Sequence, residues 1–174
     1  ISACLVGSEM CIRDRGLSMT TAYQDDNIFA RILKGEIPSI KLFDLPEAIG
    51  IMDVMPQSPG HCLVLPKAPS RNLLDAEEQT LAQLLPIVAR LARAVKEGMG
   101  ADGIVVSQFN EAAGGQTVFH LHIHVVPRYE GVELKSHASG MADSALLEEQ
   151  ARKIRAAFRS VSYTHLRAHE TGRN

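Results

Sequence analysis

Three histidines at alternate positions, His120, His122 and His124, constrain the fold of this chain more than any other feature of its sequence. Side chains alternate between the two faces of a β-strand, so the three imidazoles are predicted to share one face of a strand over residues 116–126. Three imidazoles in register need many hydrogen-bond partners if they only support the fold, so the pattern favours a functional site. The intervening residues are apolar and are predicted to face a core: Leu121, Ile123 and Val125.

Two kinds of chemistry fit this arrangement. A His-x-His pair on a strand can present two ligands to zinc, with His61 as a candidate further ligand. A neutral imidazole, whose ordinary pKa is near 6.5, is also a competent nucleophile at neutral pH. The spacing of the histidines alone leaves both open.

A glycine-bearing turn, Gly114-Gly115-Gln116-Thr117, comes directly before the histidines. Glycines let the backbone approach a ligand closely, and successive amides in such a turn can hold phosphate oxygens. The combination therefore indicates a phosphate cradle beside a nucleophile. Asp53 ends a hydrophobic strand, where it could accept from ribose hydroxyls or simply be solvated, and the sequence leaves these two interpretations equal.

The segment HLHIHVV (120–126) resembles the His-φ-His-φ-His-φ-φ signature, with φ apolar, that names the histidine triad family. The segments DNIFARILKGEIPS, MDVMPQSPGHCLVLPK and FNEAAGGQTVFHLHIHVVPR are similar to its nucleoside phosphoramidase branch. The resemblance covers most of residues 26–158. It implies an α+β, HIT-like fold: a five-stranded, mostly antiparallel sheet with one long central helix and a C-terminal helix, assembled as a homodimer whose two sheets join.

The resemblance also implies roles for individual residues. His122 would attack the α-phosphorus of a nucleoside 5′-phosphate carrying an amine, acyl or second phosphate group, giving a covalent nucleotidyl-histidine that water hydrolyses. The carbonyl of His120 would orient His122, His124 would contact the phosphate or leaving group, and His61 would complete the cluster. The implied substrate-binding residues are Asp53 for the ribose, Asn110, Gly115, Gln116 and Thr117 for the phosphate, and Ile28, Phe29, Ile51 and Leu63 for the base.

The predicted function is hydrolysis of purine nucleoside 5′-phosphoramidates or related adenosine monophosphate conjugates. Within the same chemistry, the alternative is cleavage of dinucleoside polyphosphates. Two other classes remain: a nucleotide-binding regulatory module with little essential catalysis, and a metal-dependent enzyme that uses the histidines as ligands. Some relatives bind structural zinc through a Cys-x-x-Cys pair that residues 19–160 lack, so we expect no metal and no cofactor.

Hydrophobic periodicity predicts the elements that surround this site. We expect a short helix over 28–34 capped by Asp26, a hairpin of strands 40–45 and 48–53, and a strand over 61–65. A helix over 75–97 should begin at a capping box of Asp75 and Glu78, bury Leu81, Leu84, Leu85, Val88, Leu91, Ala92 and Val95, and kink at Pro86. A strand over 104–109 and a helix over 144–158 follow, the helix with Leu146, Leu147, Ala151, Ile154 and Phe158 inward.

Composition and the two ends of the chain set the outer limits. The chain has 174 residues, is 45% hydrophobic and carries a net charge of −2 with no basic block, which disfavours nucleic-acid partners. No apolar run approaches the ~18–20 residues needed to cross a bilayer, so we expect no membrane partner. Codons chosen for residues 10–15 and 161–166 give nearly reverse-complementary strings that resemble a transposon-end sequencing adapter. We therefore predict non-native tails at 1–18 and 161–174 around a native domain at 19–160 that starts near Met19. That domain keeps only Cys62 and no signal peptide, so we expect a cytoplasmic protein.

Overall fold

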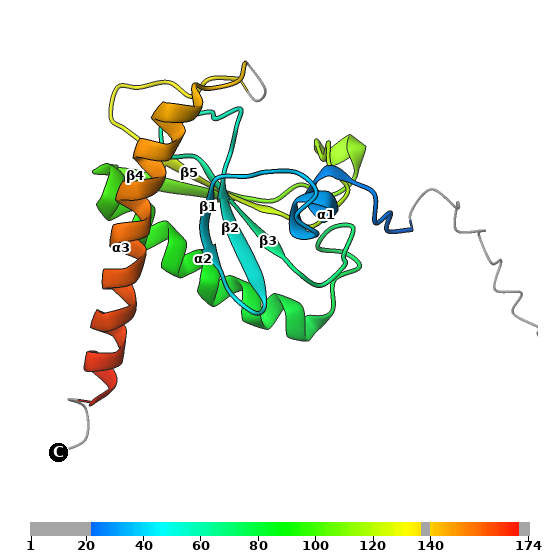
Figure 1. Cartoon of the computed structure of the whole chain (residues 1–174), viewed down its shortest axis with the longest axis horizontal. Coiled ribbons are helices and arrows are strands. Elements are labelled where there is room, and N and C mark those ends of the chain that lie inside the picture. The colour runs from blue at the N-terminus through cyan, green and yellow to red at the C-terminus, as the bar shows by residue number, and fades with distance from the viewer. Residues whose placement is uncertain (1–21, 137–139, 171–174) are drawn as a thin grey trace, which may run out of the picture.

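The computed structural model describes residues 22–136 and 140–170, with side chains up to residue 160. Within these residues, three α-helices, a short 3-10 helix and five strands follow one another. Figure 1 shows how the labelled helices and strands are arranged. Their bounds are α1 Ile28–Leu33, β1 Lys41–Asp44, β2 Ala48–Met52, β3 Cys62–Pro66, α2 Glu78–Met99, β4 Gly103–Ser107, η1 Ala112–Gly114, β5 Ile123–Arg128 and α3 Ser144–Glu170.

The five strands form one sheet in the order β1-β2-β3-β5-β4, and every neighbouring pair is antiparallel. The predicted hairpin of the first two strands is confirmed: Leu45 N–H donates to the Ala48 carbonyl across its turn. In the middle of the sheet, His124 of β5 stands opposite Leu63 of β3. The register therefore places a histidine and a leucine side by side on one face of the sheet.

Alternate residues of the central strands serve two different cores. Cys62 and Val64 of β3 join Leu121, Ile123 and Val125 in a large core with α2 and α3, which cover one face of the sheet (Figure 1). Leu63 and Leu65 point the other way and pack with Phe29 and Ile32 of α1. The predicted alternation around the histidines is confirmed, and His124 lies on the α1 face.

Helices α2 and α3 approach each other closely at Gly98. A Cβ added there would stand 2.9 Å from the Lys153 carbonyl oxygen, so any larger residue would push the helices apart. The buried apolar faces of both helices are narrower than the periodicity predicted, and Leu81 and Ala92 are only half-buried. Leu85 and Leu146 were expected to be buried, but their exposed fractions are 66% and 49%.

Several element boundaries differ from the sequence prediction, and local hydrogen bonds explain why. Asn27, not Asp26, caps α1, because its side-chain oxygen accepts from the Ala30 N–H. Helix α2 begins at Glu78 rather than at Asp75, whose carboxylate instead accepts from the N–H groups of Arg71 and Asn72. Pro86 lies inside α2 as expected.

The last helix is longer than predicted, since α3 continues from Ser144 to Glu170. It therefore crosses residue 160, where we placed the end of the native domain, and that boundary stays a prediction. The tail predicted at 1–18 lies outside the described residues. Within the described part of the chain, no helix combines the length and apolar character needed to cross a membrane.

Candidate active site

The strand that carries the histidines is shorter than the alternating sequence suggested. β5 begins at Ile123, so only His124 belongs to it, while His120 and His122 lie in the segment that enters it. The reason is that β3, the partner on this side, pairs no further than Val64 with Ile123, while the Leu121 N–H donates to the Ser70 carbonyl instead. The three rings consequently have different surroundings, and each must be considered separately.

His120 is fully buried, and it supports its neighbours rather than facing a cavity. Its Nε2–H donates to the carbonyl of Pro66 at 3.0 Å, because a carbonyl can only accept. Nδ1 is then the acceptor for the Tyr23 hydroxyl at 2.8 Å. Burial is the main cause that lowers the pKa of His120, so the ring is neutral at physiological pH.

His122 is oriented by the backbone of His120. The His122 Nδ1–H donates to the His120 carbonyl at 2.6 Å, which assigns the lone pair of the neutral ring to Nε2. The ring is 5.0 Å from that of His124, centroid to centroid, and 4.9 Å from that of Phe29. A neutral imidazole with a fixed tautomer and a buried, oriented ring meets the requirements of a nucleophile.

His61 and His124 form a second hydrogen-bonded pair. The peptide N–H of Gln57 donates to Nδ1 of His61 at 3.2 Å, so His61 carries its proton on Nε2. That Nε2–H donates to Nδ1 of His124 at 3.0 Å, which assigns the proton of His124 to its own Nε2. His122 and His124 therefore present opposite functions, one an Nε2 lone pair and the other an Nε2–H.

Asp53 closes this cluster from the end of β2. It is 8% exposed, so the interpretation as a solvated strand end is wrong. One carboxylate oxygen accepts from the Met55 N–H, and the other lies 3.5 Å from Nδ1 of His61. The second contact is not a hydrogen bond, because Nδ1 of His61 already accepts from the Gln57 amide and carries no proton in this tautomer.

Asp53, His61 and His124 also form a donor set that a metal ion can use, with ligand atoms within 4.8 Å of one another. The ring of His61 stands between the other two groups, because its two nitrogens face Asp53 and His124 respectively. The expectation of no metal stays a prediction.

An apolar cavity of about 160 Å³ borders His122 and His124 on the α1 face of the sheet. Its walls include all four residues predicted to enclose a base, together with Asp53 and Thr117. Ser39 also lines it, and its hydroxyl is buried with no hydrogen-bond partner in the described ranges. We call this space the apolar cavity; the residues predicted for the base that line it are Ile28, Phe29, Ile51 and Leu63.

A second space of about 290 Å³, the loop cavity, borders the same two histidines. Gly115 and Thr117 line it, as predicted for a phosphate site, and so do Gln57 and Phe109. Asn110 and Gln116 do not line either cavity. Their side chains support the loop over residues 109–118, which we call the glycine loop.

Gln116 shows how complete that support is. Its side-chain oxygen accepts from Asn72 and from the Glu111 N–H, and its side-chain nitrogen donates to the carbonyls of Arg71 and Val118. The oxygen of the Asn110 side chain accepts from the Leu73 N–H. Both residues therefore support the glycine loop without lining the loop cavity.

Sequence reasoning missed five residues at this site: Tyr23, Ser39, Gln57, Arg71 and Asn72. Gln57 acts through its peptide group, which no side-chain pattern could reveal. Tyr23 and Ser39 come from segments distant in sequence. The polar run Ser70-Arg71-Asn72 is buried in the structure, and only its position shortly after β3 could have drawn attention to it.

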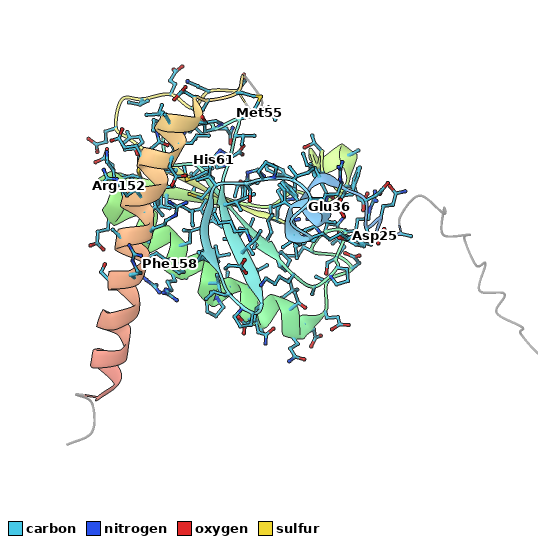
Figure 2. The ribbon with its side chains drawn as sticks, viewed as in Figure 1. Asp25, Glu36, Met55, His61, Arg152 and Phe158 are labelled. Atoms are coloured by element: carbon cyan, nitrogen blue, oxygen red, sulfur yellow. The ribbon has the colours of Figure 1, made fainter. Side chains whose placement is uncertain are left out.

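Figure 2 labels His61 and Met55, which belong to the loop that joins β2 to β3.

Comparisons with known proteins identify the family of this chain. The model of the HIT domain matches residues 34–131, more than half of the chain. The chain belongs to the HIT domain family. A solved HIT-like protein from Bartonella henselae is 51% identical, with a TM-score of 0.74 over 78% of this chain and 99% of its own. Together with the sheet described above, these findings confirm the predicted family and the α+β fold.

Several curated relatives carry the names of activities, and two of them are described here. The first, an adenylylsulfatase from Arabidopsis thaliana, is 30% identical over 88% of this chain and 76% of its own length. The second, an adenosine 5′-monophosphoramidase from Schizosaccharomyces pombe, is 33% identical over 58% of this chain and 73% of its own. Both names describe cleavage of an adenosine nucleotide conjugate.

Proposed function

We propose that this chain hydrolyses purine nucleoside 5′-phosphoramidates or related adenosine monophosphate conjugates through a covalent intermediate on His122. The observation that carries the proposal is the 2.6 Å contact between Nδ1 of His122 and the His120 carbonyl, which can only accept and so places the proton of the neutral ring on Nδ1. The lone pair is thereby assigned to Nε2 of a ring that borders both cavities. The names of the two curated relatives support the substrate class.

In the first step, Nε2 of His122 attacks the α-phosphorus, and the bond from phosphorus to the leaving group breaks. A phosphoramidate that is protonated on nitrogen releases a neutral amine, so no proton has to be found elsewhere. The His122 ring becomes a cation, which the His120 carbonyl stabilises through the Nδ1–H bond. Water then adds to phosphorus, the N–P bond breaks, one proton passes to solvent, and neutral His122 returns.

His124 assists as a hydrogen-bond donor. Its Nε2–H can donate to a phosphate oxygen or to the leaving group, where negative charge develops. The chain of hydrogen bonds from the Gln57 amide through His61 keeps that proton on the side of His124 that is turned away from His61. Asp53 borders the apolar cavity, where it would accept from a ribose hydroxyl.

The decisive experiment is mass spectrometry of protein quenched during turnover of adenosine 5′-phosphoramidate. We expect a mass increase of one adenylyl group that maps to His122, and the same quench applied to H122A as a control should show none. An adduct on another residue would overturn the assignment. Turnover that proceeds without any adduct would favour direct attack by water.

Competition between substrates tests the leaving group. We expect a higher kcat/KM for the phosphoramidate than for a dinucleoside polyphosphate, since the apolar cavity can enclose one base. The reverse order would support the alternative, a dinucleoside polyphosphate hydrolase.

Two tests address the other classes. If the chain is a regulatory nucleotide-binding module, H122A should complement a deletion of the gene as well as the wild type does. If metal ligation drives the chemistry, exhaustive chelation should abolish turnover. We expect H122A to fail to complement the deletion, and we expect chelation to leave turnover unchanged.

We also propose that two copies of the chain pair through β4. This strand lies at the edge of the sheet, and two consecutive residues within it, Val105 and Val106, are 43% and 48% exposed, one on each face. An exposed apolar edge strand is a ready template for pairing with a second chain. Sedimentation should give a dimer for the wild type and a monomer for V106K, and a monomeric wild type would refute the proposal.

A further inference from the structure

The glycine loop contains a residue in a conformation that its side chain disfavours. Glu111 has φ 61° and ψ 163°, and it is the only non-glycine residue with positive φ in the described ranges. This region of backbone space is populated almost exclusively by glycine. Such a conformation persists only where the surroundings hold it, so the contacts of Glu111 identify what fixes the loop.

Arg71 provides the strongest of these contacts. Its Nε and Nη2 donate to the two carboxylate oxygens of Glu111, both at 2.8 Å, in the bidentate geometry that a guanidinium matches best. Asn72 adds a donor at 2.7 Å to one of those oxygens. The pairing with Arg71 is also the main cause that lowers the pKa of Glu111, so the carboxylate stays charged at neutral pH.

The backbone of Glu111 is held as well. Its N–H donates to the Gln116 side chain at 2.8 Å, and its carbonyl accepts from the N–H groups of Gly114 and Gln116. These bonds bring Glu111 close to Gly115 and Thr117, the residues that line the loop cavity. A change in the backbone of Glu111 would therefore move the wall of that cavity.

Arg71 is fixed from several sides. It is 8% exposed, and its guanidinium stacks 3.9 Å from the ring centroid of Phe119. Its own N–H donates to Asp75, and the preceding residue, Ser70, accepts from the Leu121 N–H at 2.8 Å. The segment 70–72 thus joins the glycine loop to the chain that carries His120 and His122.

We propose that Arg71 and Glu111 are positioning residues, which hold the glycine loop in its strained conformation so that Gly115 and Thr117 face the phosphate beside His122. Neither side chain lines the cavities, so both act through the loop. The expected effect on kcat rests on the proposed function. The proposal that the ion pair holds the loop does not depend on that function.

The test compares R71A, R71K, E111A, E111G and E111Q with K153A, which breaks an exposed ion pair on α3. Steady-state turnover of adenosine 5′-phosphoramidate gives kcat and KM, and hydrogen exchange reports on the amides of residues 111–117. We expect kcat to fall about 100-fold in R71A and E111A, because displacing catalytic contacts by about 1 Å has effects of this size. Amide exchange in the loop should accelerate in the same variants.

The conservative variants separate positioning from general support of the fold. R71K keeps the charge but not the bidentate geometry, so its kcat should lie between those of R71A and the wild type. E111Q should also be intermediate. E111G should lose less activity than E111A, since glycine accepts the backbone conformation that alanine resists. A role limited to stability would lower Tm while leaving kcat and loop exchange unchanged, and that result would overturn the proposal.

Two further outcomes also decide the question: a variant that does not fold, and a wild type without activity. If R71A does not fold, E111Q and R71K carry the test, because both keep a polar side chain of similar size. If the wild type shows neither turnover nor an adduct on His122, the proposed function has failed, and loop exchange alone decides the inference. Wild-type exchange rates in both R71A and E111A would then refute it.

Discussion

The apolar cavity and the glycine loop border the same two histidines, but different forces build them. Helix α1 and strands β2 and β3 form the cavity by packing apolar side chains, whose burial is non-directional and tolerant of small changes. The glycine loop is held by a buried polar network around Arg71 and Gln116, in which each group depends on its partners. The comparison suggests that substitutions on the cavity side will change binding, whereas those on the loop side will change the rate of the chemical step.

The largest expected effect comes from removing the group that both regions share. H122A should lower kcat by about a thousandfold or more, as loss of a nucleophile does in other covalent enzymes. Binding of adenosine 5′-monophosphate should persist, since the apolar walls remain. Calorimetric titration and steady-state kinetics measure the two effects, and a parallel loss of nucleotide binding would contradict the separation of roles.

A truncation in the wall of the apolar cavity should have the opposite signature. Ile28 lines the cavity but is 48% exposed, so I28A should leave stability nearly unchanged. We expect KM to rise about five- to tenfold with kcat unchanged, because removing apolar contacts of about 1 kcal/mol weakens ground state and transition state alike. A fall in kcat at constant KM would show that the two regions are not separable in this way.

His120 lies behind His122, and its ionisation should affect stability. Burial lowers its pKa in the folded state, whereas the unfolded chain titrates near 6.5. Below about pH 6.5 the unfolded state binds more protons, so the free energy of unfolding should fall as the pH drops from 6.5 through the folded pKa. Urea titrations at pH 7.5 and 5.5 should show that the free energy of unfolding falls more for the wild type than for H120Q, in which this group cannot titrate. Equal losses would contradict the assignment.

The smallest effect is expected at Ser39, whose buried hydroxyl lacks a partner in the described ranges. Replacing it in S39A should stabilise the unliganded protein by up to about 1 kcal/mol, because an unsatisfied buried polar group is removed. If a bound nucleotide supplies the missing partner, the same variant should bind it a few times more weakly. Thermal unfolding with and without adenosine 5′-monophosphate measures both effects. If S39A changes Tm by the same amount with and without the nucleotide, Ser39 contributes to stability but not to nucleotide binding.

The two regions also differ in how far the sequence revealed them. The walls of the apolar cavity were predicted from the family resemblance, which implied Ile51 and Leu63 as residues that enclose the base, and both line the cavity. The start of β5 could not be predicted, because the alternating pattern at His120 and His122 is that of a strand. In the structure the Leu121 N–H donates to the Ser70 carbonyl and not to a neighbouring strand. Arg71 could not be foreseen either, as its partner Glu111 lies 40 residues away. Apolar periodicity is local, but polar pairing is set by the fold.

The hydrogen bonds through Gln57, His61 and His124 all run in one direction, and they start at a peptide group. A peptide cannot ionise or be replaced by mutation of a side chain, so position 57 can vary in sequence while the donor is retained, proline excepted. What can disturb it is movement of the loop that joins β2 to β3. That loop is tied to α3, because the Gly60 N–H donates to the side chain of Gln150 at 2.9 Å. The direction of the hydrogen bonds through His61 and His124 is therefore set by main-chain atoms of a loop that the distant helix α3 holds.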